Sequence, residues 1–320
     1  NHFRSVYIAE GYALGTGNFR ESILDPQLRT NVPFGAVWRS PDANCSLVVG
    51  HPYFYPDKQV GPWGGPSPHD MWSGTSPFQQ SVHWENVAIV LFDIPDVDPY
   101  HGTRFRWGAP IMQPVKPREN PIQSCFAYFA DTVDERVQTA HAFFLREGDV
   151  YIAIRPLAEG AQWNTSKMDG YERLDMPGAV TGCVVEIGDK SEYGSFEAFQ
   201  QRISESHLDT SRLTSDKRLS YVSTRGHRLE IRFNHDGWLP HASVNDKPLD
   251  FDAWPICECP YVTCRDRVLD VHDGRQGFTI DWRGDLPIYS YFDIVDGKRH
   301  VTGREFIDAN GRLIYDKHEH

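Results

Sequence analysis

Short runs of alternating hydrophobic and polar residues occur along the whole chain, each bounded by Gly, Pro, Asn or Asp. Val150–Arg155 and Arg228–Phe233 show the period of two that is typical of half-buried β-strands. Asn86–Asp93 ("NVAIVLFD") is apolar on both faces, which predicts a central strand covered on each side. No segments of helical length alternate regularly with these runs, so we expect antiparallel sheets and not a parallel βαβ arrangement.

One segment predicts a substantial helix, "SFEAFQQRISES" at Ser195–Ser206. Ser195 is placed to cap the first turn, and Glu197 lies in that turn, where the helix dipole favours a carboxylate. Phe196, Phe199 and Ile203 form one apolar stripe, so the helix is expected to pack on a sheet or to join two sheets.

The fold class predicted from these patterns is all-β, a large antiparallel β-sandwich with one short helix and a smaller C-terminal β-sheet region. The polar stretch "SHLDTSRLTSDKR" suggests a break between a larger region, residues 1–205, and a smaller antiparallel region, residues 215–320. Turn signals such as "NHDG", "VDGK" and "DANGR" crowd the last hundred residues and favour a meander of short strands. A single domain is the alternative.

The amino-acid composition limits the classes of partner that the chain is expected to bind. With 40% hydrophobic residues the chain can bury a large core, and its net charge of −12 argues against broad binding to nucleic acid or anionic membranes. No stretch reaches the roughly 20 apolar residues of a membrane-spanning helix. We therefore expect no nucleic-acid or membrane partner.

The segment Tyr53–Asn86 is rich in Pro, Gly and aromatic residues, which predicts a long loop. Long loops without secondary structure are usually functional. Sugar rings present apolar faces edged by hydroxyl groups, and a site for them needs aromatic platforms and polar side chains. The loop supplies both types, so we expect an oligo- or polysaccharide partner, bound by Trp63, Trp72, Gln79 and Gln80. The alternative is a loop whose Trp residues cover one end of the sandwich.

Two further groups of residues suit ligand binding. His51 and Asp57 could hold a metal, because imidazole and carboxylate bind zinc and related divalent ions. The sequence assigns no other cofactor, and a divalent metal such as zinc or calcium is the one that these residues would bind. "PYHGTRFRWG" adds Arg104, Arg106 and Trp107, which could bind a carboxylate or sulfate and stack on a sugar. A solvated loop is the alternative for that segment.

The order of "GHPYFYPD", "SPFQQSVHWENVAIVLFDIP", "FLREGDVYIAIRPL" and "YGSFEAFQ" resembles the β-supersandwich of heparinase II/III-type and related polysaccharide lyases. The resemblance covers about residues 30–300 and lies in the overall pattern, not in a diagnostic motif. It implies stacked antiparallel sheets and cleavage of a uronic-acid polysaccharide by β-elimination. The family usually carries catalytic residues on a preceding (α/α) barrel, which this chain lacks. A missing N-terminal helical domain or another subunit is therefore an expected partner, and a secreted or periplasmic location is expected for action on polysaccharide.

A lyase must neutralise the uronate carboxylate, remove the C5 proton and protonate the leaving oxygen. Arg155, Arg104, Arg106 or a metal would neutralise the carboxylate. The base would be His83 or His69, and the acid Tyr53 or Tyr55. Two alternatives to a lyase stay open: a non-catalytic carbohydrate-binding or structural module of a larger enzyme, and an aldose-epimerase-like sandwich enzyme.

The aromatic loop generates the first prediction. If Trp72 stacks on a sugar, Trp72→Ala should weaken oligosaccharide binding about tenfold, equivalent to about 1.4 kcal/mol, with little loss of stability. Titration calorimetry and thermal unfolding of the same variant measure the two quantities. A loss of about 3–5 kcal/mol of folding stability would instead identify Trp72 as a core residue.

Overall fold

The computed structural model describes residues 2–19, 33–38, 46–50, 79–93, 124–129, 134–168, 171–252, 257–258, 262–284, 286–308 and 310–317. The chain forms two compact units. Unit 1 comprises Asn1–Arg4 and Gly11–Leu249, and unit 2 comprises Ser5–Glu10 and Asp250–His320. Among the described residues, no helix is long and apolar enough to cross a membrane.

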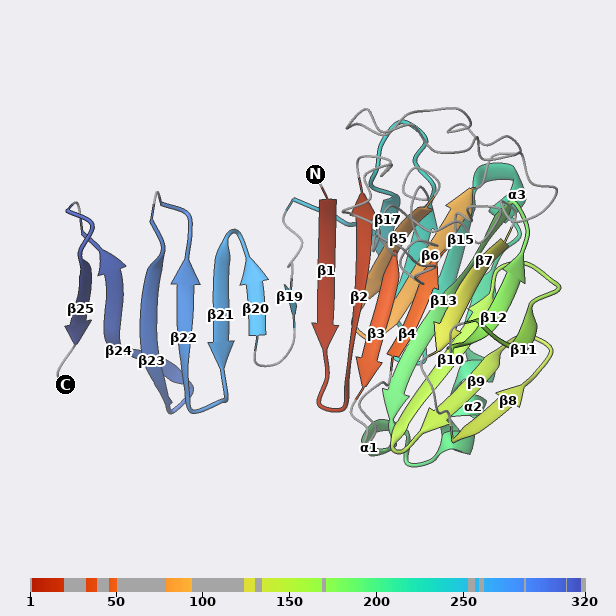
Figure 1. Ribbon diagram of the computed structural model, residues 1–320, viewed down its shortest axis with the longest axis horizontal. Helices are drawn as coiled ribbons and strands as arrows, with labels where there is room; N and C mark the ends of the chain where they lie inside the picture. Colours follow the sequence, from red (N-terminus) through yellow and green to blue (C-terminus); the bar gives the residue numbers. More distant parts are fainter. Residues whose placement is uncertain are drawn as a thin grey trace. The chain divides into compact units, whose positions relative to one another are not determined.

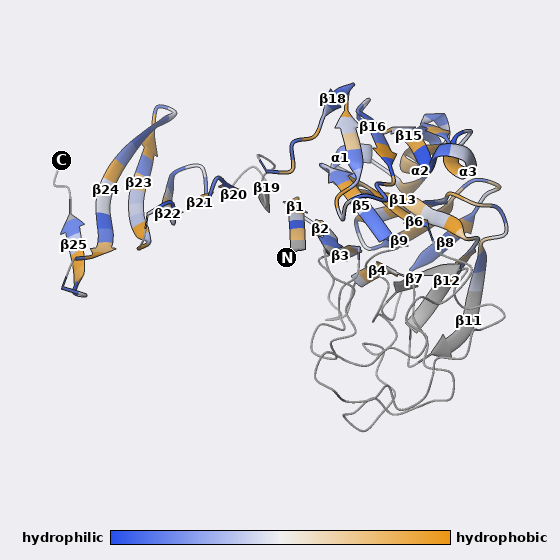
Figure 2. Cartoon of the chain, turned by 90° about the horizontal axis from the view of Figure 1, so that it is seen from above, coloured by the Kyte–Doolittle hydropathy of each residue, from blue (hydrophilic) through white to orange (hydrophobic). Residues whose placement is uncertain are grey.

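A six-stranded antiparallel sheet forms the middle layer of unit 1 (Figure 1). Its strands, in spatial order, are β5 (Gln79–Trp84), β6 (Val87–Asp93), β13 (Val180–Asp189), β10 (Val150–Pro156), β9 (Phe143–Glu147) and β8 (Glu135–Gln138). The side chains of Val87 to Phe92 are all buried, which confirms the strand covered on both faces that the sequence predicts. Figure 2 shows hydrophobic segments on β6 and β13 within this unit.

A five-stranded antiparallel sheet covers one face of this middle sheet. Its strands are β14 (His207–Asp209), β15 (Arg218–Val222), β16 (Arg228–Arg232), β17 (His241–Val244) and β18 (Lys247–Pro248). Alternate residues of β15 and β16, such as Leu219 and Ile231, pack with Val82, Ile89 and Leu91 in one hydrophobic cluster. The alternation predicted for Arg228–Phe233 is thus confirmed, with the buried side chains facing the middle sheet.

Six more strands of unit 1 lie on the other face. They are β11 (Gln162–Met168), β12 (Tyr171–Pro177), β7 (Ser124–Phe129), β4 (Ser46–Gly50), β3 (Phe34–Trp38) and β2 (Tyr12–Phe19). Ser81 donates to the carbonyl oxygen of Pro33, and Asn18 donates to that of Ser81. Because adjacent residues of a strand point to opposite faces, Ser81 faces β2 while Val82 faces the five-stranded sheet. The middle sheet is therefore enclosed by two layers.

Three helices occur among the described residues, α1 (Lys190–Tyr193), α2 (Phe196–Glu205) and α3 (Leu213–Asp216). The ten-residue α2 confirms the predicted helix, and Ser195 caps it by accepting from the backbone N–H of Ala198 at 3.2 Å. Its apolar stripe packs on β9 and β10, where Phe199 contacts Phe144 and Tyr151.

Unit 2 is a meander of antiparallel strands preceded by one parallel pair. Val6 and Tyr7 of β1 (His2–Ile8) pair in parallel with β19 (Cys257–Glu258). The meander continues through β20 (Val262–Arg265), β21 (Val268–His272), β22 (Gln276–Asp281), β23 (Ile288–Val295), β24 (Lys298–Ile307) and β25 (Leu313–Lys317). Asp296 and Gly297 join β23 to β24 with positive φ at both positions, as a two-residue hairpin turn requires. Figure 2 shows hydrophobic and hydrophilic stretches along β23 and β24.

The division between the units falls at Leu249, whereas the sequence suggested a break between residues 205 and 215. The difference arises because the polar stretch there is structured. His207 to Asp209 pair with β15, and Leu213 joins the hydrophobic cluster beneath the five-stranded sheet. The strands from β14 to β18 therefore belong to the larger unit.

The packing of α2 gives a stability prediction. Phe199→Ala should lower the free energy of unfolding by about 3–5 kcal/mol, because the ring is fully buried against three other aromatic side chains. Gln201→Ala, on the exposed side of the same helix, should change it by less than about 0.5 kcal/mol. Urea unfolding of both variants checks the pair, and equal losses would contradict the packing described for α2.

Candidate functional site

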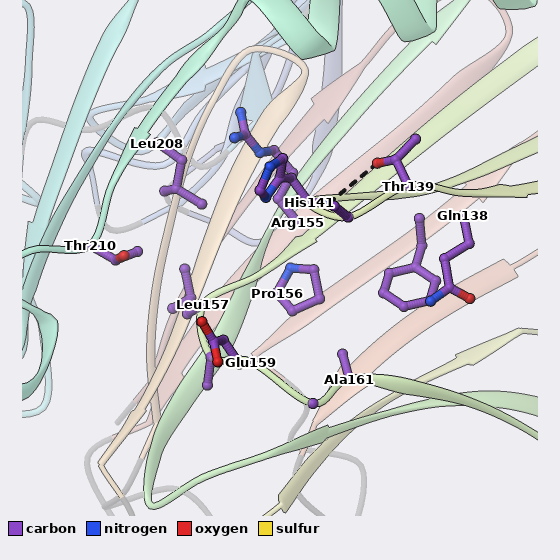
Figure 3. Close-up of a pocket in the computed structure, with 14 residues that line it drawn as sticks. Gln138, Thr139, His141, Arg155, Pro156, Leu157, Glu159, Ala161, Leu208 and Thr210 are labelled. Carbon is purple, nitrogen blue, oxygen red and sulfur yellow. Dashed lines mark hydrogen bonds between the residues drawn. The ribbon is translucent and has the colours of Figure 1, made fainter.

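A pocket of about 290 Å³ lies in unit 1, and three stretches of chain distant in sequence line it (Figure 3). The first is the turn between β8 and β9, the second is the end of β10 with the residues that follow, and the third is the segment around β14. Polar side chains from all three contribute, namely Gln138, Thr139, His141, Arg155, Glu159 and Thr210. This volume is at the lower end of the range for small-molecule sites.

Arg155 is the cation of this pocket. Its Nη1 atom donates to the carbonyl oxygen of Ser206 at 3.1 Å and to Ser206 Oγ at 2.9 Å. Its Cζ atom lies 5.7 Å from the ring centroid of Tyr221. The Nε atom is buried, and none of the residues that the structure describes accepts a hydrogen bond from it. One nitrogen of the guanidinium is thus anchored, while a second is a buried donor without an acceptor.

A hydrogen-bonded turn brings His141 to the pocket. Thr139 Oγ1 accepts from the backbone N–H group of His141 at 3.3 Å (Figure 3) and from that of Ala142 at 3.1 Å. This arrangement is a local Ser/Thr turn, which fixes the backbone before β9. Phe143, the first residue of β9, also lines the pocket and lies edge-on to Trp163, with 5.9 Å between ring centroids. Polar and aromatic side chains therefore adjoin at this end of the sheet.

Of the site residues named from the sequence, four are described, and only Arg155 lines this pocket. Gln79, Gln80 and His83 are buried in β5. The amide of Gln80 clamps a neighbouring loop, donating to Asn234 O at 2.8 Å and Gly237 O at 3.0 Å. Binding of sugar by Gln79 and Gln80 stays a prediction. The other predicted residues lie outside the described part of the chain: His51, Tyr53, Tyr55, Asp57, Trp63, His69, Trp72, Arg104, Arg106 and Trp107.

His83 lies inside unit 1, with only 4% of its surface exposed. Its Nδ1 atom is 2.8 Å from Thr16 Oγ1. Burial lowers the pKa of the imidazole from 6.5 to about 4, so it is neutral at pH 7. A general base must come within hydrogen-bonding reach of its substrate, and in this position His83 contacts the interior. Its assignment as the base stays a prediction.

The structure adds residues that the sequence analysis did not name, chiefly His141, Glu159 and Glu186. His141 and Glu159 follow the ends of β8 and β10, where polar residues could have been flagged as the rim of a site. Glu186 is a carboxylate in the middle of the apolar run "GCVVEIG", a position that is unusual unless the charge has partners. Among the described residues, no group of three His, Cys, Asp or Glu is placed to hold a metal.

Comparison of the chain with protein-family models, with curated proteins and with solved structures found no match in any of the three.

The burial of His83 predicts a pH dependence of stability. In the unfolded chain the imidazole takes up a proton near pH 6.5, and in the fold only near pH 4. The unfolded state therefore binds more protons between these values, and stability falls as the pH drops through this window. The loss assigned to His83 is about 3 kcal/mol.

The measurement is the slope of unfolding free energy against pH for the wild type and for His83→Gln. The variant should show a shallower slope between pH 6.5 and pH 4, whatever its absolute stability. Identical slopes would mean that folding does not change the pKa of His83, as expected for an imidazole exposed to solvent.

Proposed function

We propose that this chain is a carbohydrate-active β-sandwich protein that binds an acidic oligosaccharide in the pocket at Arg155. The observation that carries the proposal is the buried Nε donor of Arg155, which lacks an acceptor on a guanidinium already anchored through Nη1. A buried donor without a partner costs about 1–3 kcal/mol. A carboxylate is suited to supply the acceptor, because its two oxygens match the fork of a guanidinium.

The rest of the lining suits a sugar. Phe143, Pro156, Leu157 and Leu208 offer apolar surface for the C–H groups of a pyranose ring. Around them, the amide of Gln138, the hydroxyls of Thr139 and Thr210 and the carboxylate of Glu159 can bond sugar hydroxyls. A uronic acid combines a hydroxylated ring with one carboxylate. The resemblance to polysaccharide lyases points to the same class of ligand.

Cleavage by β-elimination is the second candidate function, and the presence of His141 in the same pocket favours it. Elimination needs a cation to neutralise the carboxylate and a base to remove the C5 proton. Arg155 would serve as the cation and His141 as the base, and the proton that His141 takes up would be passed to the leaving oxygen as the C4–O bond breaks. The activity would appear as absorbance of an unsaturated uronate when the protein is incubated with a panel of uronic-acid polysaccharides, and His141→Gln should abolish it.

Binding is tested by titration calorimetry with trimers of galacturonate, glucuronate and mannuronate, and with their carboxyl-reduced neutral counterparts. At least one acidic trimer should bind the wild type. Arg155→Met should weaken that binding tenfold or more, since about 1.4 kcal/mol corresponds to a factor of ten. The exposed Arg232→Met, on β16, makes the same chemical change and should leave the affinity unaltered.

Two outcomes would contradict the proposal. One is equal affinity of the wild type and Arg155→Met for the acidic trimer. The other is absence of binding to every uronate trimer by a folded wild-type protein.

A further inference from the structure

Glu186, in the buried strand β13, is the end of a chain of hydrogen bonds. Only 1% of its surface is exposed. One carboxylate oxygen accepts from the Tyr221 hydroxyl at 2.6 Å, and the other accepts from the backbone N–H of Thr224 at 3.1 Å and from the Thr224 hydroxyl. Three donors, one from β15 and two from the turn that follows it, therefore converge on this one carboxylate.

The chain continues from Tyr221 to the pocket. Tyr221 Oη lies 3.0 Å from Ser206 Oγ, and Ser206 Oγ accepts from Arg155 Nη1 at 2.9 Å. Two hydroxyl groups thus connect the buried carboxylate to the guanidinium of the candidate site. Among the described ion pairs, none includes Arg155 or Glu186. Arg155 and Glu186 are therefore the two opposite charges at the ends of this chain of hydrogen bonds.

The hydrogen bonds of this chain have a donor-to-acceptor direction, because each hydroxyl group has only one proton to donate. Tyr221 has one hydroxyl proton and donates it to Glu186, so its oxygen is left to accept from Ser206. In the structure the Ser206 hydroxyl donates to the carbonyl oxygen of Ile203 at 2.6 Å, so its one proton must turn from that acceptor to point at Tyr221. When Glu186 is ionised, the donors from Arg155 through Ser206 and Tyr221 can all point towards it. A proton on Glu186 removes the charge that favours this alignment.

Other charged and titratable groups also surround Glu186. Glu192 and Tyr193 come from α1, and Tyr193 bonds the hydroxyl of Thr224 at 2.6 Å. Arg225 forms a two-point ion pair with Glu192, both contacts being 2.7 Å, and a further pair with Glu85 at 2.8 Å. The charge of Arg225 is thus directed to those two carboxylates. Burial raises the pKa of Glu186, and the hydrogen bonds from Thr224 and Tyr221 oppose that rise.

We propose that Glu186 is the internal counter-charge of Arg155, and that an anion bound to Arg155 is coupled through Ser206 and Tyr221 to proton uptake by Glu186. The carboxylate of a bound ligand would neutralise the guanidinium of Arg155. Glu186 would then lose the cation that favours its ionised form, so its pKa would rise. Because coupling is reciprocal, a proton on Glu186 strengthens binding of the anion. Ser206, Tyr221 and Glu186 act as positioning residues. The ligand part of the proposal rests on the proposed function.

The coupling is first measured without a ligand, from the carboxyl ¹³C resonance of Glu186 followed against pH. Glu186→Gln identifies the resonance by removing it. Arg155→Met should shift the titration midpoint of Glu186 upward by roughly half a unit to one unit, because a favourable cation is lost. Arg232→Met should leave the midpoint unchanged. Arg155→Met would also leave it unchanged if Arg155 had a purely structural role. An unchanged midpoint in Arg155→Met would overturn the proposal.

Tyr221→Phe tests the route. It preserves the buried ring but removes the hydroxyl between Ser206 and Glu186, so the additional shift caused by Arg155→Met should shrink in the double variant. If Tyr221→Phe does not fold, Ser206→Ala interrupts the chain one step nearer the pocket and serves the same comparison. An equal Arg155→Met shift with and without the intervening hydroxyl would contradict the hydrogen-bonded route.

The ligand arm uses the acidic trimer that binds best, titrated by calorimetry in buffers of different ionisation enthalpy. Binding near the midpoint of Glu186 should take up a fraction of a proton, and the uptake should disappear in Glu186→Gln. Binding without proton uptake would overturn the coupling and leave the proposed function intact. Absence of binding would overturn the proposed function, while the ligand-free shift would still decide whether Arg155 and Glu186 interact.

Discussion

The middle sheet of unit 1 is covered on both faces, and this constraint governs the polar groups that are buried between the layers. Unsatisfied polar groups are expensive in such a setting, so each needs a partner from a covering layer. Ser81 finds carbonyl oxygens of the β2–β3 region, and His83 finds the hydroxyl of Thr16. On the opposite face, Glu186 finds donors from Tyr221 and Thr224. The contacts that fix the layers are therefore also those that satisfy buried polar groups.

The candidate site lies where the covering of the sheet changes. The helix α2 packs on β9 and β10, whereas the five-stranded sheet packs on β5, β6 and β13. Ser206 is the residue between α2 and β14, and it holds the guanidinium of Arg155 at this junction. The side chain of Arg155 is on the same face of β10 as the buried Tyr151, so the charge of the guanidinium lies close to the core. A cation in this position needs acceptors, which Ser206 supplies in part and a ligand can complete.

Local sequence patterns predicted the strands and the helix well, but they did not predict which distant residues contact one another. The two-sided burial of β6 followed from "NVAIVLFD", and the capped helix followed from Ser195 and its apolar stripe, because both depend on neighbours in the sequence. Glu186 and Tyr221 are 35 residues apart, and Arg155 and Ser206 are 51 apart. Such pairs depend on strand order, which periodicity does not encode. The same limit applies to β5, where the contacts of Gln80 with Asn234 and of His83 with Thr16 join segments that are distant in the sequence.

The central claim, that Arg155 receives a carboxylate, is tested most directly by a crystal structure of the protein soaked with a uronate trimer. The account predicts a sugar ring against Phe143 and Leu157, with carboxylate oxygens within about 3 Å of the Arg155 guanidinium. It also predicts that Nη1 keeps its bonds to Ser206. A trimer bound elsewhere on the surface, or bound in the pocket with its carboxylate directed away from Arg155, would contradict the account.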